Sequence, residues 1–233
     1  MIQGKNMPRK PRMYMVGVPC HVIQRGNNRD ACFFSDDDYL FYLECLKDAC
    51  ERYQVSCYAY VLMTNHTHLL LNPTQDDGIS KVMQSLGRRY VQYINKYYKR
   101  SGTLWEGRHK SSLVDVENYL LSCYRYIELN PVMANMVKHP GDYRWSSYRS
   151  NAYGENNKVV RQHDVYLGLG QNKHSRLSNY RELFNTALSK TVIHAIRNAA
   201  NFSMPVGDSR FKQQIERTLD RSIGQAKRGR PRI

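Results

Sequence analysis

The chain has 233 residues, and its 35 Lys and Arg outnumber its 20 Asp and Glu to give a net charge of +15. Hydrophobic residues make up 41% of the chain, which is enough for a packed core and excludes a fully disordered protein. No stretch approaches the ~20 apolar residues of a membrane-spanning helix, and the basic N-terminus lacks the apolar core of a signal peptide. We therefore expect a cytoplasmic protein that makes no membrane contact. The excess of positive charge indicates a polyanionic partner, with nucleic acid favoured over lipid.

Positive charge is unevenly distributed along the chain. Residues 1–150 carry a net charge of +6, whereas the shorter segment 151–233 carries +9. The stretch NAYGENNK at residues 151–158 is rich in turn-forming residues and poor in large apolar ones. We therefore expect two domains, one over residues 1–150 and a basic extension over residues 151–233.

The first half of the chain alternates strand and helix signals. Residues 20–25 have the composition of a short strand. Ser35 followed by Asp38 resembles a capping box, and apolar residues at helical spacing then predict a helix over residues 37–52. Residues 55–63 alternate in the way expected of a strand with one face in the core.

The next elements follow after a short turn at Thr64 and Asn65. A second strand is predicted over residues 66–71, antiparallel to the first because the connection is so short. A long amphipathic helix is predicted over residues 79–97, and a further strand over 110–116. Residues 117–130 should form a helix that Pro131 ends.

The resulting order is strand, helix, strand, strand, helix, strand, helix. This order predicts an α+β fold of the ferredoxin-like type, an antiparallel sheet with helices on one face and one extra helix after it. Beyond residue 161, helices are expected around residues 178–188, 191–200 and 209–222. The extension should therefore be helical and basic, and the tail KRGRPRI should form a flexible arm.

The sharpest chemical feature is the sequence His66-Thr67-His68. Residues i and i+2 of a strand point to the same face, so both imidazoles could chelate one divalent ion. An H-x-H sequence by itself is a weak signal, because a buried pair of histidines can simply be hydrogen-bonded.

A second feature is the helical i, i+4 spacing of Tyr126 and Asn130. If their face of the helix opposes the histidines, Asn130 can supply an oxygen as the third ligand while Tyr126 stands beside the metal as a nucleophile. Such a ligand set suits Mg²⁺ or Mn²⁺ better than a structural zinc site. Tyr124 and Glu128 have the same spacing, so spacing alone does not choose between the two pairs.

The motifs NHTHLLL, LWEGRHKSSLV and YRYIELNPV occur in that order, and PCHVIQRGNNR and WSSY also fit the same pattern. Together they resemble the single-tyrosine HUH transposases of the IS200-like superfamily, specifically the REP-associated tyrosine transposases, over residues 18–148. The resemblance implies an HUH nuclease fold, His66, His68 and Asn130 as metal ligands, and Tyr126 as the nucleophile that forms a 5′-phosphotyrosine intermediate. The middle residue of the HUH motif is usually hydrophobic, and Thr67 departs from that pattern.

The same resemblance implies a metal-dependent endonuclease and strand transferase that acts on single-stranded DNA hairpins of the REP type, as a monomer or a homodimer. Basic residues near aromatic ones suit contacts with phosphates and bases, although those of helix 79–97 also fit an ordinary solvated face. The tail resembles a minor-groove hook, and it could equally bind any polyanion. The residues expected to contact DNA are Arg88, Arg89, Lys96, Arg108, Lys110, Lys227, Arg228, Arg230 and Arg232.

Three other functions share part of this pattern. A non-catalytic protein that binds DNA hairpins and regulates them would use the same basic residues. A replication-initiator nuclease of the wider HUH group would share the chemistry, but it usually carries further tyrosine or helicase motifs. A two-histidine phosphoesterase needs a second H-x-[ST] element, and the sequence shows no convincing one.

Overall fold

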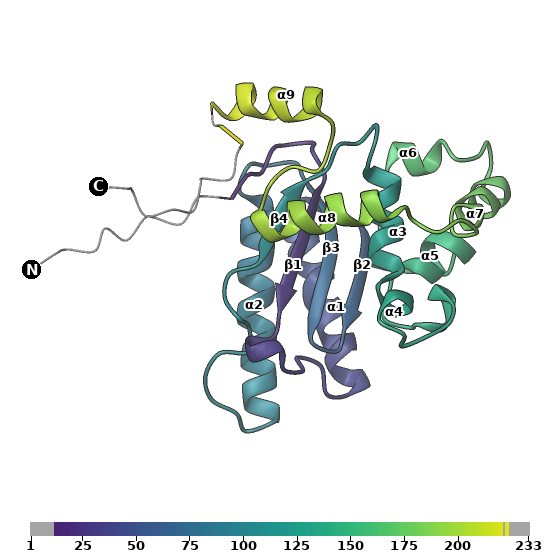
Figure 1. Ribbon diagram of the computed structural model, residues 1–233. Helices are drawn as coiled ribbons and strands as arrows, with labels where there is room; N and C mark the ends of the chain where they lie inside the picture. Colours follow the sequence, from purple (N-terminus) through teal and green to yellow (C-terminus); the bar gives the residue numbers. More distant parts are fainter. Residues whose placement is uncertain (1–11, 221, 224–233) are drawn as a thin grey trace, which may run out of the picture.

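The computed structural model describes residues 12–220, 222 and 223, and it has an α+β architecture (Figure 1). Four antiparallel strands form one sheet in the order β2-β3-β1-β4. The strands alternate with helices in the predicted ferredoxin-like order. The strand bounds are β1 Cys20–Arg25, β2 Val55–Met63, β3 His66–Pro73 and β4 Lys110–Leu113.

Helices α1 (Asp36–Arg52) and α2 (Gly78–Tyr97) cover one face of the sheet. Their apolar sides pack against each other and against that face in a single hydrophobic cluster. The predicted capping box begins α1, because the Asp38 carboxylate accepts hydrogen bonds from the backbone of Phe34 and Ser35.

Helices α3 (Leu120–Glu128) and α8 (Lys190–Phe202) cover the other face. Figure 1 shows α8 crossing in front of the sheet. Both faces of the sheet are therefore buried, each in its own hydrophobic cluster. The remaining helices are α4 Asn130–Met133, α5 Tyr148–Tyr153, α6 Asp164–Leu167, α7 Lys173–Glu182 and α9 Ser209–Leu219, with short 3-10 helices at Asn27–Arg29 and Pro140–Asp142.

Strand β2 does not keep the simple alternation that its sequence predicts. A β-bulge shifts its register against β3 between Cys57 and Ala59. Val55 and Cys57 consequently face α1 and α2, whereas Ala59 and Val61 face α3. An extra residue in one strand moves all later side chains to the opposite face. The prediction of one face in the core was wrong here, because both faces of β2 are covered.

The helix predicted over residues 117–130 is shorter and is followed by a second helix. The Asp115 carboxylate accepts hydrogen bonds from the backbone of Glu117 and Asn118, and this turn delays the start of α3. Helix α3 ends at Glu128, and Pro131 lies in the first turn of α4, where its missing N–H is not needed.

The C-terminal helices also differ in their bounds from the predicted ones. Helix α7 begins at Lys173 because Asn172 and Ser175 cap it reciprocally, and it ends at Glu182. Residues 183–188 are not helical. Helices α8 and α9 lie within two to three residues of the predicted ranges.

The segment around residue 150 lies inside α5, so a helix spans the boundary that the sequence predicts. Tyr166 and Tyr180, which follow this boundary, pack in the same cluster as Tyr124 of α3. The division into domains 1–150 and 151–233 stays a prediction about which parts fold independently. Among the described helices, none combines the length and the apolar character that crossing a bilayer requires.

A buried carboxylate joins α3 to the elements that follow it. Glu128 is fully buried and accepts hydrogen bonds from the Ser147 hydroxyl, the Asn151 amide and the Tyr180 hydroxyl. The three donors favour the ionised form, but burial outweighs them and raises the pKa of Glu128 to about 7. The folded protein therefore holds a proton that the unfolded chain releases near pH 4.5.

This raised pKa predicts a pH-dependent stability. The contribution of Glu128 to the free energy of unfolding should be most favourable below about pH 4.5. It should decline as pH rises through 7, by roughly 3 kcal/mol in total. In Glu128→Gln the neutral amide can keep all three hydrogen bonds, so this decline should disappear. Urea unfolding at pH 5 and pH 8 measures it, with Glu155→Gln at an exposed site as the control. Equal pH slopes for wild type and Glu128→Gln would show that the carboxylate is not protonated in the fold.

Candidate active site

Two histidines of β3 stand on the face of the sheet that α3 and α8 cover. The register pairs His66 with Arg25 and His68 with Ile23, and paired residues of antiparallel strands point to the same face. The ring centroids of His66 and His68 are 5.1 Å apart. Thr67 points to the opposite face and is fully buried there, so its hydroxyl does not enter the site.

A third histidine, His21 of β1, belongs to the same cluster. Its Nε2 lies 2.8 Å from Nδ1 of His68, and the two rings stack with centroids 5.1 Å apart. The sequence analysis did not predict this residue as part of the site. Its segment, PCHVIQR, is predicted as a strand and fits the same motif pattern as His66 and His68, but the pattern gives His21 no role, and His21 and His68 are 47 residues apart. Only the register of β1 against β3 shows that they touch.

Hydrogen bonds on the Nδ1 side orient the rings of His66 and His68. Nδ1 of His66 lies 2.7 Å from the side-chain oxygen of Asn65, and Nδ1 of His68 lies against His21. Burial lowers the pKa of His66 to about 4 and that of His68 well below its usual range. Both imidazoles are therefore neutral near pH 7. Neither ring uses its Nε2 in these hydrogen bonds. This is the form of histidine that ligates metal ions.

Helix α3 places Tyr126 against the same histidines. The Tyr126 ring meets the rings of His21 and His68 edge to face, with centroid distances of 5.9 Å to each. The helix packs on β2 and β3, and the Tyr126 side chain is 5% exposed, at the boundary between the core and the site. Among the described residues, none forms a hydrogen bond with the Tyr126 hydroxyl. The ring is thus held against the histidines, while its hydroxyl has no fixed partner in this part of the structure.

Tyr124, which has the same i, i+4 spacing to Glu128 as Tyr126 has to Asn130, has different surroundings. Its ring lies in the core between Tyr58, Tyr166 and Tyr180, and its hydroxyl is buried. Glu128, its i+4 neighbour, binds elements of the C-terminal part instead of the histidines. The structure therefore brings Tyr126, and not Tyr124, to the histidine cluster.

Asn130 lies at the junction between α3 and α4. Its side-chain amide donates to the backbone oxygens of Tyr126 and Ile127, at 2.8 and 3.3 Å, and so caps the end of α3. Because the amide nitrogen is used in this way, its side-chain oxygen points away from these two carbonyls. Within the described part of the chain, no group of three or more His, Cys, Asp or Glu side chains is arranged as a metal site. A site made of His66, His68 and the Asn130 amide does not conflict with this absence, because asparagine is not one of those four residue types.

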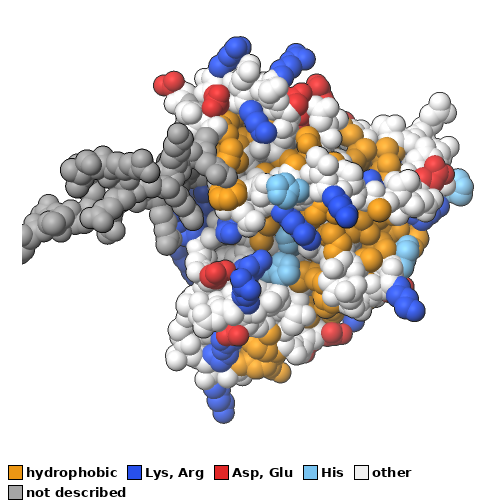
Figure 2. Space-filling model, viewed as in Figure 1, with side chains coloured by type: hydrophobic (Ala, Val, Ile, Leu, Met, Phe, Trp, Pro, Cys, Tyr) orange, Lys and Arg blue, Asp and Glu red, His pale blue; other side chains and the backbone are white. Residues whose placement is uncertain are grey.

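Basic side chains surround a cleft beside the histidines. The cleft has a volume of about 240 Å³. Ile23 is one of its lining residues, and the register pairs Ile23 with His68 on one side and with Lys110 on the other. Figure 2 shows Lys, Arg and His side chains gathered in the middle of this face of the molecule. The residues lining the cleft are Ile23, Arg25, Glu106, Gly107, Arg108, Lys110 and Asn201.

The other basic residues predicted to contact DNA lie elsewhere. Arg88, Arg89 and Lys96 belong to α2, which packs on the face opposite the histidines. Arg89 forms an ion pair of 2.9 Å with Asp48 of α1. The structure does not bring these residues to the histidine cluster, and their contact with DNA stays a prediction. The tail residues Lys227, Arg228, Arg230 and Arg232 lie outside the described residues.

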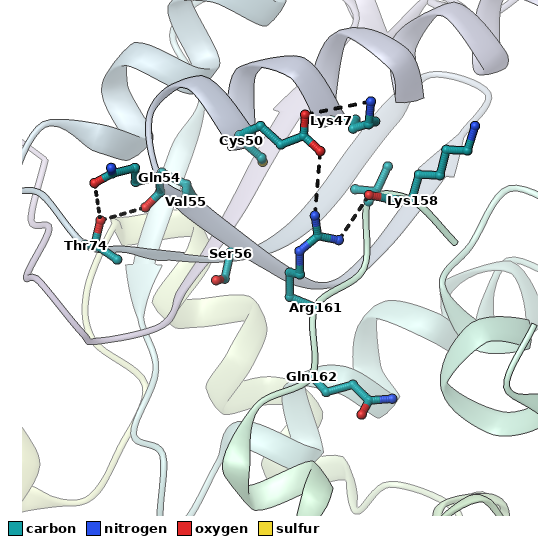
Figure 3. Close-up of a pocket in the computed structure, with 11 residues that line it drawn as sticks. Lys47, Cys50, Gln54, Val55, Ser56, Thr74, Lys158, Arg161 and Gln162 are labelled. Atoms are coloured by element: carbon teal, nitrogen blue, oxygen red, sulfur yellow. Dashed lines mark hydrogen bonds and ion pairs between the residues drawn. The ribbon is translucent and has the colours of Figure 1, made fainter. Parts of the chain in front are cut away.

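A larger cavity of about 600 Å³ lies between α1, the start of β2 and the segment around Arg161 (Figure 3). Glu51 lies 3.7 Å from both Lys47 and Arg161 and so pairs with two of the three cations that line the cavity. The residues that line it include no histidine and only one carboxylate. This cavity therefore lacks the groups that the histidine face brings together.

Comparison with known proteins agrees with this arrangement. Residues 15–130 match the family model described as "Transposase IS200 like". The matched segment begins before β1 and ends at Asn130, and it contains the histidines, the cleft strand β4 and Tyr126. Residues 15–130 therefore form a domain of the IS200-like transposase family.

More particularly, the chain is similar to the REP-associated tyrosine transposases, as its motifs predict. It is 26% identical to a Haemophilus influenzae protein named as such a transposase, over 120 residues that cover 47% of this chain and 68% of that protein. A solved REP-associated tyrosine transposase bound to a REP hairpin has the same fold, with a TM-score of 0.55 at 17% identity, covering 67% of this chain and 93% of that one. A transposase structure from Deinococcus radiodurans aligns with a TM-score of 0.38 at 19% identity, over 55% of this chain and 96% of that one. That last similarity is too low to support a conclusion.

Proposed function

We propose that this protein is a metal-dependent endonuclease and strand transferase that cuts single-stranded DNA beside REP-type hairpins. The observation that carries the proposal is the position of Tyr126 against His21 and His68. The negative charge of a phosphodiester repels an incoming nucleophile, and a basic cleft offsets that charge. A phenol beside imidazoles and such a cleft is therefore suited to attack on the phosphorus. Membership of a transposase family and the REP-associated relatives support the same reaction class.

Tyr126 acts as the nucleophile in this proposal. Its phenol oxygen forms a bond to phosphorus, the bond from phosphorus to the 3′ oxygen breaks, and the phenol proton is released while the 3′ oxygen leaves as a hydroxyl. The product is a 5′-phosphotyrosine joined to one DNA end. A 3′ hydroxyl of another strand can reverse the step, so strands are rejoined without a high-energy cofactor.

The donor set of the site fits a divalent cation. His66 and His68 would bind it through Nε2, and Asn130 would add its amide oxygen after a change of side-chain rotamer or through water. Two nitrogens, one oxygen and further water positions suit Mg²⁺ or Mn²⁺. When bound, the ion withdraws negative charge from the phosphate. Nε2 of His68 would be free for it in the tautomer whose Nδ1–H donates to Nε2 of His21.

Single-stranded DNA is the proposed substrate because the reacting phosphate must reach a nearly buried hydroxyl. Tyr126 is 5% exposed and lies between its own helix α3 and the histidines of the sheet, so a stiff duplex backbone has little access to it. A flexible single strand can follow the basic cleft over β1 and β4 to the histidines. The hairpin preference comes from the REP-associated relatives. Action as a monomer or a homodimer in the cytoplasm remains part of the proposal.

Replacing the nucleophile tests this function. In Tyr126→Phe we expect DNA cleavage to fall by about a thousandfold or more and the covalent adduct to disappear, with hairpin binding retained. Labelled hairpin oligonucleotides incubated with Mg²⁺ or Mn²⁺ show the cleavage, and mass spectrometry identifies the DNA-linked peptide. Tyr124→Phe is the matched control, because its buried hydroxyl has no hydrogen-bond partner among the described residues. Undiminished cleavage in Tyr126→Phe would exclude it as nucleophile, and binding without cleavage in the wild type would indicate a hairpin-binding regulator.

The role of His21 gives a second prediction. His21→Phe removes the hydrogen-bond partner of His68 while it keeps a ring in the stack, so Mn²⁺ affinity should fall by about tenfold or more. Calorimetric titration of the protein without DNA measures the affinity. The variant His174→Phe, which replaces an exposed histidine of α7, is the control. Unchanged affinity in His21→Phe would show that His68 is not oriented by this contact.

The cleft cations give a third prediction. Arg108→Ala should weaken binding of single-stranded DNA by about fivefold and lower the slope of log affinity against log salt by about 0.7. Fluorescence anisotropy over a range of salt concentrations measures both quantities. Arg161→Ala, whose guanidinium is paired with Glu51 in the other cavity, should leave both unchanged. An equal effect in the two variants would contradict the assignment of the cleft as the path of the DNA.

A further inference from the structure

Helix α8 lies over the histidine face although it begins more than 120 residues after His68 in the sequence. It contacts β1 and β4 of the sheet and also α3, which carries Tyr126. Its buried side chains Ile196, Ala199 and Ala200 hold it there. The family match ends at residue 130, so this helix is outside the matched domain.

The end of α8 is tied to the edge of the sheet. The Val206 N–H donates to the Leu113 oxygen at 2.8 Å, and the Asp115 N–H donates to the Val206 oxygen at 2.9 Å. These bonds continue the pairing of the sheet beyond β4. Gly207 follows directly, and a side chain there would collide with Asp115 and Phe211. The position of α8 is therefore fixed by backbone hydrogen bonds and close packing as well as by its apolar face.

The exposed side of α8 presents two polar side chains to the cleft. Arg197 and Asn201 are both exposed and are one helical turn apart, so they share a face. Asn201 lines the cleft together with Arg25 and Lys110 of the sheet. Arg197 lies one turn before Asn201 on the same exposed side of α8, which packs against β1, the strand that carries Arg25. The two residues thus border the path from the cleft to the histidines.

The positive charges around this path are not neutralised within the fold. Among the described residues, Arg25, Arg108, Lys110 and Arg197 form no ion pair, and Glu106 is the only acidic residue that lines the cleft. Arg161 in the other cavity, by contrast, has a carboxylate partner. Unpaired cations around a hollow attract an anion, and a guanidinium with an amide can donate several hydrogen bonds to one phosphate.

We infer that α8 is the second wall of the DNA-binding cleft, and that Arg197 and Asn201 hold a backbone phosphate next to the bond that Tyr126 attacks. This inference rests on the proposed function. The strand follows the cleft beside α8, with Arg25 and Lys110 of the sheet on one side of it and Arg197 and Asn201 on the other. Arg197 and Asn201 are binding and positioning residues in this arrangement, and Tyr126 remains the nucleophile.

The test combines Arg197→Ala with a chemical change in the DNA. Binding is measured in the Tyr126→Phe background, so that no cleavage occurs, with a single-stranded oligonucleotide that carries a hairpin and unpaired flanks. Methylphosphonate linkages, which remove the charge of one phosphate, are placed one at a time along the flank. We expect Arg197→Ala to weaken binding about five- to tenfold and to lower the salt slope by about 0.7. We expect one or two linkages next to the cut site to weaken binding with Arg197 present and to have little further effect in Arg197→Ala.

Two controls separate this contact from general loss of charge or of folding. Arg217→Ala removes an exposed cation of α9 that does not line the cleft, and it should show no position-dependent effect. Thermal unfolding of Arg197→Ala should match the wild type, because the side chain is exposed. Asn201→Ala should act at the same linkages as Arg197→Ala, with a smaller loss of about twofold.

The outcomes are distinct. Loss of the methylphosphonate effect at particular linkages in Arg197→Ala supports the inference. Equal binding by Arg197→Ala and Arg217→Ala, or an unchanged methylphosphonate profile, overturns it. If wild-type protein cuts no hairpin, the proposed function fails, and the same binding measurements still show whether α8 contacts the DNA backbone.

Discussion

The antiparallel register of β1 against β3 is the constraint on which the candidate site depends. It pairs Ile23 with His68 and thereby places His21 beside His68 at hydrogen-bond distance. A shift by one residue would turn His66 and His68 toward α1 and α2, where Thr67 now lies in the core. The buried apolar residues on both faces prevent that shift, so the packing of the sheet fixes the position of the imidazoles.

A second layer of structure, built largely from the C-terminal part, completes this face. Glu128 binds Tyr180 of α7 and Ser147, so the helix that carries Tyr126 is anchored to elements that follow it. Helix α8 then closes the face over β1 and β4. A family match that ends at residue 130 therefore contains the histidines and Tyr126 but only part of the surroundings that hold them.

Much of the fold could be predicted because its signals are local. The capping box at Ser35, the strand composition of residues 20–25 and the short turn before residues 66–71 depend on neighbouring residues, and these elements lie close to where the sequence predicts them. The predictions that were wrong have two kinds of cause, one a strand pairing between separate segments and the other a local turn. The bulge in β2 depends on its pairing with β3, and the late start of α3 depends on a turn at Asp115.

For the site, the sequence determined that His66 and His68 share one face, because side chains alternate along any strand. It also limited the choice of tyrosine to two, through helical spacing, and only the motif resemblance favoured Tyr126. The tertiary structure decided that Tyr126 contacts the histidines, that His21 is the hydrogen-bond partner of His68, and that α8 borders the cleft. These contacts join residues 47 or more positions apart, and they arise from strand register and helix packing, which periodicity within one segment does not specify.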